Sequence, residues 1–292
     1  MTTRADALLV PFSREKHQMT PLILRDRWVL VTGASSGLGQ EIARVLAHRH
    51  GANLVVVARR ADRLEVLRKK LEAEAGVKVA PITADLSRME DVDRLFQHAT
   101  DGRSLSGAVL NAGVTHFGDH DELSWNEFDA MLSTNVRSIV RMSRELIPHL
   151  EAQSEGGGLM LVSSLAGLTP VPYQTAYSAT KAFLVHYGCG LSHELNGRNV
   201  SITTFAPGGI ITEMTAGARF DKLRSFLMPV DVCATEAVEA FRRRDYLAIP
   251  GLSNRIGTTL MRFLPQRFLT GRVAATYRKS LGASRAAGTK SG

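Results

Sequence analysis

The sequence predicts an α/β fold, in which one doubly wound parallel sheet carries helices on both faces. Short, nearly uninterrupted apolar runs recur along the chain, and helical apolar spacing fills the intervals between them. Continuous apolar strands are typical of a parallel sheet that is covered on both sides. The composition shows no linker-like change before about residue 251, and 292 residues with 44% apolar content suffice for one large domain.

The expected elements alternate in a regular order. Strands are predicted at residues 28–33, 53–58, 77–84, 107–113, 159–164, 200–208 and 246–251, about seven in all. Helices are predicted around Ile42, around Leu67, around Leu95, over 125–150 and over 177–195. Right-handed crossovers between such strands give a Rossmann-like topology, with ligands beyond the carboxyl ends of the strands. We expect an N-terminal extension over 1–26, one domain over 27–251 and a tail over 252–292.

A glycine-rich turn, TGASSGLG at 32–39, joins the first strand to the first helix. Gly33 allows a sharp turn, and Gly37 and Gly39 allow the backbone to approach a pyrophosphate. The helix N-terminus then offers N–H groups to the phosphates. This position between a strand and a helix favours a dinucleotide site over a purely structural turn. Ser35 and Ser36 are equally well explained as turn residues and as hydrogen-bond partners near a 2′-phosphate.

The end of the second strand favours one cofactor. A carboxylate about 20 positions past the glycines would bind a ribose 2′-hydroxyl. That place is taken here by Ala58, followed by Arg59 and Arg60. Because a guanidinium pairs with a 2′-phosphate, the sequence predicts NADP(H) over NAD(H), with Arg59 as the contact. The alternative is that these arginines only begin a solvated helix.

Tyr177 and Lys181 lie four positions apart in TAYSATKAF, on one face of a predicted helix. This spacing is common, and alone it indicates little. The turns after the fourth, fifth and sixth predicted strands, at 111–113, 163–164 and 207–212, are expected to face the same crevice. The pair therefore lies among candidate ligand-binding turns.

Taken together, the motifs resemble the short-chain dehydrogenase/reductase family. The matching pieces are TGASSGLG at 32–39, ADL at 84–86, NAG at 111–113, STN at 133–135, SS at 163–164, AYSATK at 176–181 and PGGIIT at 207–212, in the family's order. They cover about residues 28–250. The resemblance implies a homologous fold and NAD(P)-linked hydride transfer to or from a carbonyl or alcohol.

The resemblance also implies roles for single residues. Tyr177 matches the family's acid/base, and Lys181 would lower the tyrosine pKa and bind the nicotinamide ribose. Ser164, thirteen residues before Tyr177, matches the family spacing better than Ser163 and would hold the carbonyl oxygen. Asn135 would hold a water in a proton relay, unless it is a helix-surface amide. The implied cofactor contacts are Gly33, Ser35, Ser36, Gly37, Leu38, Gly39, Arg59, Asp85, Leu86, Asn111, Ala112, Gly113, Tyr177, Lys181, Pro207, Gly208, Ile210 and Thr212. No metal site is predicted.

On the substrate side, residues 212–228 are expected to form a mobile lid. The expected wall is mostly apolar and consists of Val114, His116, Phe117, Leu165, Pro170, Val171 and Tyr173. A hydrophobic carbonyl or alcohol is therefore predicted, such as a fatty-acyl, steroid or other lipid-like compound. His116 is more simply explained as a polar loop residue than as a catalytic one.

The tail carries the charge of the protein. The net charge is +8, and residues 246–292 contain eight Lys or Arg and no Asp or Glu. Nucleic-acid binding is not favoured, because the rest of the chain is balanced. Two segments, 252–264 and 266–281, show amphipathic helical spacing, which fits weak contact with an anionic membrane, closure of the pocket or packing on another subunit. Residues 282–292 are expected to be disordered.

The remaining expectations concern assembly and location. The two cysteines, Cys189 and Cys233, suggest no disulfide framework, and the sequence offers no signal-peptide core or membrane span, so a cytoplasmic protein is expected. The resemblance implies a homodimer or homotetramer formed through helices near 125–150 and 175–196. Two other functions are weighed: a dinucleotide-binding sensor or scaffold without turnover, and a peripheral membrane protein governed by its tail.

Overall fold

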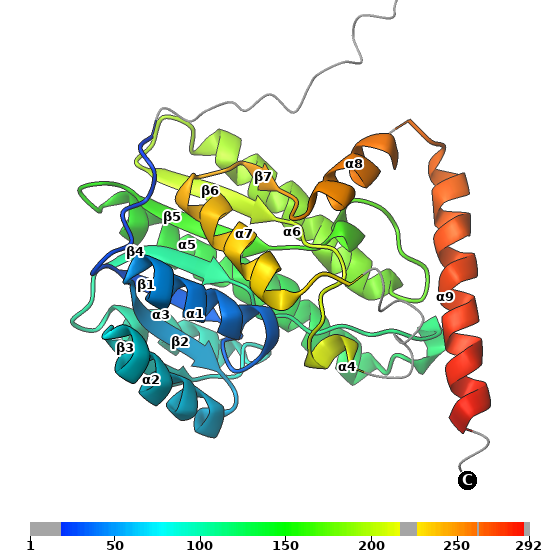
Figure 1. Cartoon of the computed structure of the whole chain (residues 1–292), viewed down its shortest axis with the longest axis horizontal. Helices are drawn as coiled ribbons and strands as arrows, with labels where there is room; N and C mark the ends of the chain where they lie inside the picture. Colours follow the sequence, from blue (N-terminus) through cyan, green and yellow to red (C-terminus); the bar gives the residue numbers. More distant parts are fainter. Residues whose placement is uncertain (1–18, 217–226, 262, 289–292) are drawn as a thin grey trace, which may run out of the picture.

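A computed structural model describes residues 19–216, 227–261 and 263–288 (Figure 1). Within these residues, seven parallel strands form one sheet in the order β3-β2-β1-β4-β5-β6-β7. The strands are β1 (Trp28–Thr32), β2 (Asn53–Ala58), β3 (Val79–Thr83), β4 (Leu105–Leu110), β5 (Gly157–Val162), β6 (Val200–Phe205) and β7 (Leu247–Ala248). The predicted fold class, a doubly wound parallel sheet, is confirmed.

Helices cover both faces of the sheet, as the apolar strands require. One layer consists of α1 (Gly37–His50), α2 (Ala61–Ala75) and α7 (Val230–Arg242), and the other of α3 (Met89–Thr100), α5 (Ser138–Glu151) and α6 (Thr175–Glu194). Successive residues of β1 serve the two cores in turn: Val29 and Val31 pack under the first layer, and Leu30 packs under the second.

The helix predicted over 125–150 is divided in three. It consists of α4 (Trp125–Leu132), a π-helical segment η2 (Ser133–Arg137) and α5. The amide of Ser138 donates to the carbonyl of Ser133, five residues earlier, which widens the helix at this point. The π-helical segment buries Asn135 completely, whereas an unbroken α-helix would give its side chain another direction.

The strand order determines where a ligand can bind. The chain crosses from β3 back past β1 to β4, so β1 and β4 are neighbours and their carboxyl ends diverge into loops on opposite sides. Thr32, the last residue of β1, links these loops, because its Oγ1 accepts hydrogen bonds from the amides of Asn111 (3.0 Å) and Ala112 (3.1 Å).

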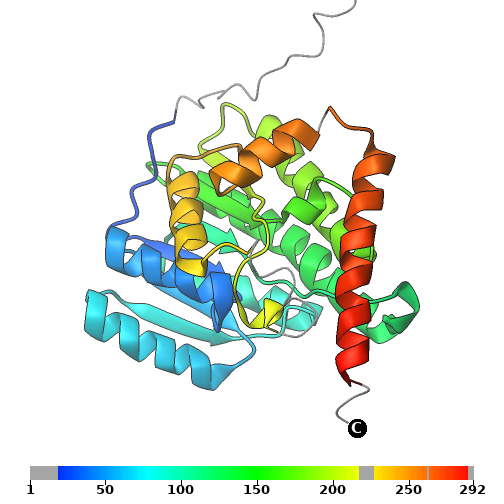
Figure 2. The ribbon, with the colours of Figure 1, turned by 45° about the vertical axis from the view of Figure 1, so that its right-hand side comes forward.

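Two helices form the tail, α8 (Leu252–Met261) and α9 (Gln266–Gly288). Both lie at the end of the molecule toward which the strands point, and α9 stands apart from the sheet as a long rod (Figures 1 and 2). Residues 282–292 were expected to be disordered, but α9 continues to Gly288; residues 289–292 lie outside the described part, as do 1–18 of the N-terminal extension. In the described ranges, every helix is too short or too polar to cross a membrane.

Candidate active site

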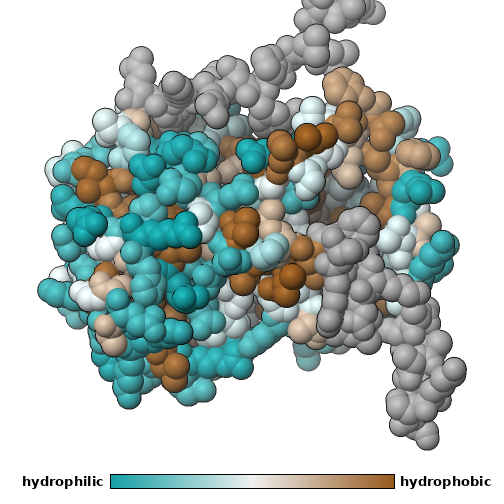
Figure 3. Space-filling model, viewed as in Figure 1, coloured by the Kyte–Doolittle hydropathy of each residue, from teal (hydrophilic) through white to brown (hydrophobic). Residues whose placement is uncertain are grey.

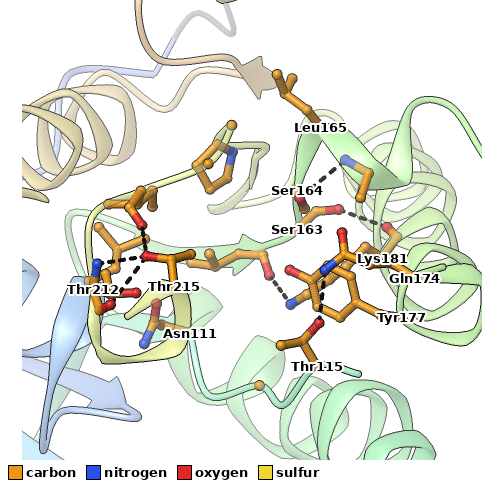
Figure 4. Close-up of a pocket in the computed structure, with 18 of the residues that line it drawn as sticks. Asn111, Thr115, Ser163, Ser164, Leu165, Gln174, Tyr177, Lys181, Thr212 and Thr215 are labelled. Atoms are coloured by element: carbon orange, nitrogen blue, oxygen red, sulfur yellow. Dashed lines mark hydrogen bonds between the residues drawn. The ribbon is translucent and has the colours of Figure 1, made fainter. Parts of the chain in front are cut away.

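A cavity of about 1330 Å³ opens at the carboxyl ends of the strands. Its wall comes from the glycine-rich turn after β1, the loops after β4, β5 and β6, the start of α6, and the tail helices α8 and α9. Figure 4 shows Ser164, Tyr177 and Lys181 on one side of this space and Thr212 and Thr215 on the other. All the expected catalytic and cofactor-binding residues line the cavity except Gly39 and Asn135, which lie directly behind its wall.

The glycine-rich turn has the shape that its sequence predicts. Gly33 and Gly37 have φ of +69° and +56°, the left-handed region that glycine adopts without strain. A Cβ atom on Gly33 would lie 2.9 Å from Asn111 Nδ2, and one on Gly39 would collide with the same amide and with the carbonyl of Gly33. The turn therefore packs too closely against the loop after β4 for larger residues.

The N-terminus of α1 faces the cavity and fits a pyrophosphate. Within the described residues, the Ser36 side chain caps none of its N–H groups, and the first turn contains no acidic residue. These donors and the helix dipole favour an anion. The residues that line the cavity match the donor set of a dinucleotide site: backbone N–H groups at the start of α1, an arginine beyond β2 and a lysine on α6.

Arg60, rather than Arg59, reaches the glycine-rich turn. Its guanidinium donates to Ser35 Oγ (3.1 and 3.2 Å) and to Ser36 Oγ (2.7 Å). Arg59 also lines the cavity, but its side chain is exposed. Glu213 accepts hydrogen bonds from Arg60 (3.2 Å) and Arg63 (2.6 Å), and these two arginines hold the pKa of its carboxyl below the usual value. The sequence predicted Arg59 at this place, whereas Arg60 makes the contact with Ser35 and Ser36. The pairing of Glu213 with these arginines was not predicted.

The other expected cofactor contacts surround the same space. Asp85 and Leu86 line the cavity, and Asp85 Oδ1 accepts from the Ser87 amide and hydroxyl at 3.0 and 2.8 Å. The amide side chain of Asn111 donates to the carbonyl of Thr32 (3.0 Å), which fixes the loop after β4. The remaining expected contacts in the wall are Leu38, Ala112, Gly113, Pro207, Gly208, Ile210 and Thr212.

Tyr177 presents its hydroxyl to the cavity beside Ser164 (Figure 4). Burial raises the pKa of the Tyr177 hydroxyl, and a hydrogen bond with the Ser164 side chain acts in the opposite direction. The sequence analysis expected a lowered pKa from Lys181. Its ammonium lies 5.8 Å from the centre of the tyrosine ring, and desolvation is the larger effect in the protein alone.

The two serines after β5 have different partners. Ser163 is buried, and its hydroxyl donates to the carbonyl of Lys181 (2.7 Å), so it fixes α6 to the sheet. Ser164 lines the cavity beside Tyr177 (Figure 4), and its hydroxyl accepts from the Ala166 amide (3.1 Å). This difference agrees with the choice of Ser164 over Ser163.

Lys181 is only 3% exposed, and its ammonium donates to the carbonyl of Val162 (2.9 Å). Burial lowers its pKa to about 8. An ammonium has three donors. Because Lys181 also lines the cavity, its remaining N–H groups are available to hydroxyl groups of a ligand.

Asn135 positions the loop that follows β4. Its amide donates to the carbonyl of Val114 (2.9 Å) and to Thr180 Oγ1 (3.0 Å), and its Oδ1 accepts from the Val114 amide (2.9 Å). It is fully buried, which is the opposite of a helix-surface amide. In this position Asn135 joins the loop at Val114 to α6. Tyr177 and Lys181 lie four residues apart on that helix.

The part of the cavity in which a substrate was expected is formed in part by the tail. Of the expected wall residues, Val114, Leu165 and Val171 line the cavity. Among the described residues, His116, Phe117, Pro170 and Tyr173 stand outside its wall. Residues from α9 and the turn before it take their place: Leu264, Leu269, Val273, Thr276 and Tyr277. Of the expected lid, 217–226 lie outside the described residues.

Phe117 and Tyr173 instead have a structural role, because both contact α9. The Phe117 ring packs edge-on against Tyr277, with centroids 5.1 Å apart, and the Tyr173 hydroxyl accepts from Arg278 Nε at 2.9 Å. His116 turns to the carbonyl of Asp119 at 3.2 Å. The periodic apolar residues of the tail were visible in the sequence, but their docking site was not.

Comparison with curated proteins gives relatives of known class. The chain is 36% identical to "Nodulation protein G" of Rhizobium sp. (strain N33), over 66% of this chain and 76% of that protein. It is 30% identical to "17-beta-hydroxysteroid dehydrogenase type 3" of Mus musculus, over 65% of this chain and 62% of that protein. It is 29% identical to "Very-long-chain 3-oxoacyl-CoA reductase" of Anas platyrhynchos, over 67% of this chain and 64% of that protein. The chain thus spans less than two thirds of the last two.

Solved structures agree in fold. A short-chain dehydrogenase from Sphingobium yanoikuyae in complex with NADPH matches with a TM-score of 0.70 and 28% identity, over 81% of this chain and 93% of that one. A 3-ketoacyl-(acyl-carrier-protein) reductase from Brucella melitensis complexed with NADH matches with a TM-score of 0.69 and 27% identity, over 77% of this chain and 96% of that one. A 7beta-hydroxysteroid dehydrogenase, with 23% identity and a TM-score of 0.76 over 85% and 96%, shares the fold.

The family model described as "short chain dehydrogenase" matches residues 27–222, about two thirds of the chain and all the elements from β1 to the loop after β6. The glycine-rich turn, the buried lysine and the cavity-facing tyrosine lie within that match. The chain belongs to the short-chain dehydrogenase family, oxidoreductases that act on hydroxyl or keto groups with a nicotinamide dinucleotide.

Proposed function

We propose that this protein uses NADP(H) to interconvert an apolar ketone and the corresponding secondary alcohol. The observation that carries the proposal is the position of Tyr177, which lines the cavity beside Ser164 (Figure 4) and has the Lys181 ammonium near its ring. A binding module without turnover needs none of these three groups in one place. They favour the enzyme over a sensor or scaffold.

A nicotinamide dinucleotide held by the glycine-rich turn and Lys181 would supply or accept the hydride. In reduction, the Tyr177 hydroxyl donates its proton to the carbonyl oxygen, and in oxidation the phenolate takes it back. The Ser164 hydroxyl holds the same oxygen as negative charge develops there. Lys181 binds ribose hydroxyls with its remaining N–H groups and stabilises the phenolate once it forms.

The raised pKa of Tyr177 is consistent with reduction. Burial keeps the hydroxyl protonated at neutral pH, and a protonated tyrosine is the form that can deliver a proton. Oxidation requires the phenolate, and thus depends on the positive charge of Lys181 nearby. The protonated hydroxyl is thus the form that serves carbonyl reduction.

The preference for NADP(H) is supported by the groups beyond β2. Arg60 lies against Ser35 and Ser36, where the adenosine ribose of a dinucleotide would come to lie, and Arg63 is one helical turn further along α2. Two guanidinium groups and two hydroxyls suit a dianionic 2′-phosphate. A carboxylate from the strand end, which would favour NAD(H), is replaced here by Ala58 and Arg59.

An apolar substrate is supported by the lining of the far end of the cavity. Leu165, Leu168, Val171, Leu264, Leu269 and Val273 contribute to this wall. Among the relatives, the names of two proteins specify a hydroxysteroid and a very-long-chain 3-oxoacyl-CoA. We infer a substrate of the same broad kind, with a long or polycyclic apolar body beside its reacting carbonyl.

The test is NADPH oxidation by the purified protein with ketones and acyl thioesters of increasing apolar length. We expect turnover that rises with length, and a loss of roughly 100-fold or more in Tyr177→Phe with unchanged NADPH binding. Tyr187→Phe is the matched control, because Tyr187 lies on the same helix and outside the cavity wall. Undiminished turnover in Tyr177→Phe would remove the proton-transfer role.

We also propose a homodimer or homotetramer that pairs through α5 and α6. Phe183 supports this, because it is 39% exposed on α6 and stacks on Tyr187 with centroids 5.5 Å apart. An exposed aromatic side chain is typical of an interface. Light scattering would give the mass, and a monomer at working concentration would contradict the proposal.

A further inference from the structure

A cluster of exposed apolar side chains covers the outer side of α8 and the start of α9. It is called here the tail surface and consists of Leu252, Ile256, Leu260, Phe263, Leu264 and Phe268, whose exposed fractions range from 45% to 71%. Brown side chains gather in this region, over α8 and the upper end of α9, in Figure 3. Clusters of this kind on a folded protein mark a site of interaction.

The orientation of α8 is the reverse of an ordinary surface helix. Asn254, Thr258 and Thr259 line the cavity, and the Asn254 amide lies next to Gly208. Leu252, Ile256 and Leu260, spaced by four residues, point outward, and none of the ten residues of α8, all described, is buried. A soluble helix normally turns its apolar side inward. Here the apolar side is presented to the surroundings.

The charge on the tail helices themselves is of one sign. From residue 246 to 292 the sequence has eight Lys or Arg and no Asp or Glu. Arg267 and Arg272 are exposed residues of α9, whereas Arg255 of α8 is exposed and lies 3.7 Å from the carboxylate of Glu236. A second copy of the chain would bring the same positive charge to a two-fold contact, so like charges would oppose pairing through this surface. The complementary partner is anionic.

We propose that the tail surface binds the interface of an anionic lipid bilayer. In this arrangement α8 lies along the membrane plane, with its leucines and isoleucine among the acyl chains and its neighbouring arginines among the lipid phosphates. The turn between α8 and α9 inserts Phe263 and Leu264, and Phe268 follows on the first turn of α9. The binding is peripheral and reversible.

The tail surface meets the cavity at the turn between α8 and α9. Met261 and Leu264 belong to the cavity wall and are also 40% and 45% exposed. An apolar path therefore runs from the membrane side to the cavity. Delivery of a lipid-dissolved substrate along this path rests on the proposed function, whereas membrane binding itself does not.

The test is co-sedimentation of the full chain with vesicles of phosphatidylcholine, with and without phosphatidylglycerol. Leu260→Asp with Phe263→Asp removes the centre of the tail surface without touching the cavity wall. Val66→Asp on α2 is the matched control, because Val66 is 67% exposed and lies elsewhere on the molecule. Arg267→Gln with Arg272→Gln tests the charge. Circular dichroism checks that each variant is folded.

We expect the wild type and Val66→Asp to sediment with the anionic vesicles and to be released by high salt. The apolar double variant should lose roughly tenfold or more in partitioning, and the arginine double variant should lose its salt dependence together with much of its binding. Equal binding by the apolar double variant, or equal binding to pure phosphatidylcholine, would overturn the proposal. A fall in assembly mass in that variant, without lipid binding by the wild type, would assign the surface to subunit pairing instead.

A second measurement separates this proposal from the proposed function. NADPH oxidation is followed with one ketone held in the vesicles and one that is soluble in water. We expect the apolar double variant to retain its rate on the soluble ketone and to lose several-fold on the vesicle-borne one. If the wild type binds vesicles but oxidises NADPH with neither ketone, the proposed function fails, while the proposal that the tail surface binds membranes stands.

Discussion

At the scale of single residues, the structure distinguishes the roles of two adjacent arginines, Arg59 and Arg60. Their spacing in the sequence does not distinguish them. Arg59 directly follows β2, and its side chain is exposed, whereas Arg60 is the N-cap residue of α2 and turns back to Ser35 and Ser36. Where a strand ends and a helix begins, a shift of one residue redirects the side chain completely. Spacing in the sequence identifies the place, and the backbone path decides which arginine occupies it.

We expect Arg60→Ala to weaken NADPH binding much more than Arg59→Ala does. A charge-assisted hydrogen bond contributes about 1.5 to 3 kcal/mol, so the Kd for NADPH should rise roughly tenfold to 100-fold. The Kd for NADH should change little, because NADH has no 2′-phosphate. Fluorescence titration of both cofactors with both variants measures this. A larger effect of Arg59→Ala would return the contact to Arg59.

The buried charge of Lys181 predicts a stability that depends on pH. Folding lowers its pKa from 10.5 to about 8, so between these values the unfolded chain holds a proton that the folded chain has lost. The free energy of unfolding therefore rises with pH in this window, and below about pH 8 the full cost of the buried charge is present. Lys181→Met removes that cost and its pH dependence.

We expect Lys181→Met to be more stable than the wild type at pH 7 and to lose this advantage as the pH rises. The difference between the two proteins should shrink by about 3 kcal/mol from pH 8 to pH 10.5, because one pKa unit corresponds to about 1.36 kcal/mol. Urea unfolding at several pH values measures it. A constant difference across this range would show that the lysine is not a buried cation.

At the scale of elements, the strands and helices could be predicted because their apolar periods are strong. The π-helical segment η2 could not be, since STNVR has no signal that distinguishes it from the α-helices on either side. The resemblance implied a role for Asn135 in holding water. The structure gives its side chain three hydrogen bonds to Val114 and Thr180, so it positions the loop after β4 as well.

The short helix η4 (Glu213–Thr215) forms a clasp across the cofactor end of the cavity. Glu213 extends from the loop after β6 to Arg60 and Arg63 on the far side. The Glu213 carboxylate therefore pairs with the Arg60 guanidinium, which is the group proposed to bind a 2′-phosphate. If the cofactor is NADP(H), as proposed, its 2′-phosphate would compete with Glu213 for Arg60.

We expect Glu213→Gln to tighten NADPH binding roughly three- to tenfold and to leave NADH binding unchanged, because a neutral amide competes more weakly for Arg60. Glu65→Gln on α2 is the control, since Glu65 pairs with Arg68 away from the cavity. Isothermal titration with NADPH, NADH and 2′,5′-ADP gives the affinities. Weaker NADPH binding in Glu213→Gln would mean that the clasp supports the cofactor rather than competing with it.

At the scale of the whole molecule, the parallel sheet could be predicted from the sequence, and the packing of the tail could not. Apolar spacing in 252–281 identified amphipathic helices, but the same spacing fits a membrane face, a pocket wall and a subunit contact. The structure assigns different residues to different tasks: α9 turns Leu269, Val273 and Tyr277 into the cavity, while α8 turns Asn254 and Thr258 inward. Periodicity gives a helix its apolar side, and only tertiary contacts decide what that side meets.

The position of α9 depends on a few contacts between residues that are far apart in the sequence. The Arg278 guanidinium bonds the Tyr173 hydroxyl, and the Tyr277 ring packs on Phe117. Tyr173 has a φ of +65°, an uncommon backbone conformation for a residue other than glycine. Its side chain therefore leaves the loop before α6 in an unusual direction, toward α9, which forms the substrate end of the cavity while Arg60 and Gly33 form the cofactor end.

We therefore expect Arg278→Gln to raise the KM for large apolar ketones about two- to fivefold and to leave the Kd for NADPH unchanged, because it loosens only the substrate end. Tyr173→Phe removes the same hydrogen bond from the other side. The double variant should then be no worse than either single variant, since both changes delete one interaction. Steady-state kinetics with a short and a long ketone, together with NADPH titration, measure these effects. Additive losses, or a weakened affinity for NADPH, would show that α9 acts on the site by a route other than its contact with Tyr173.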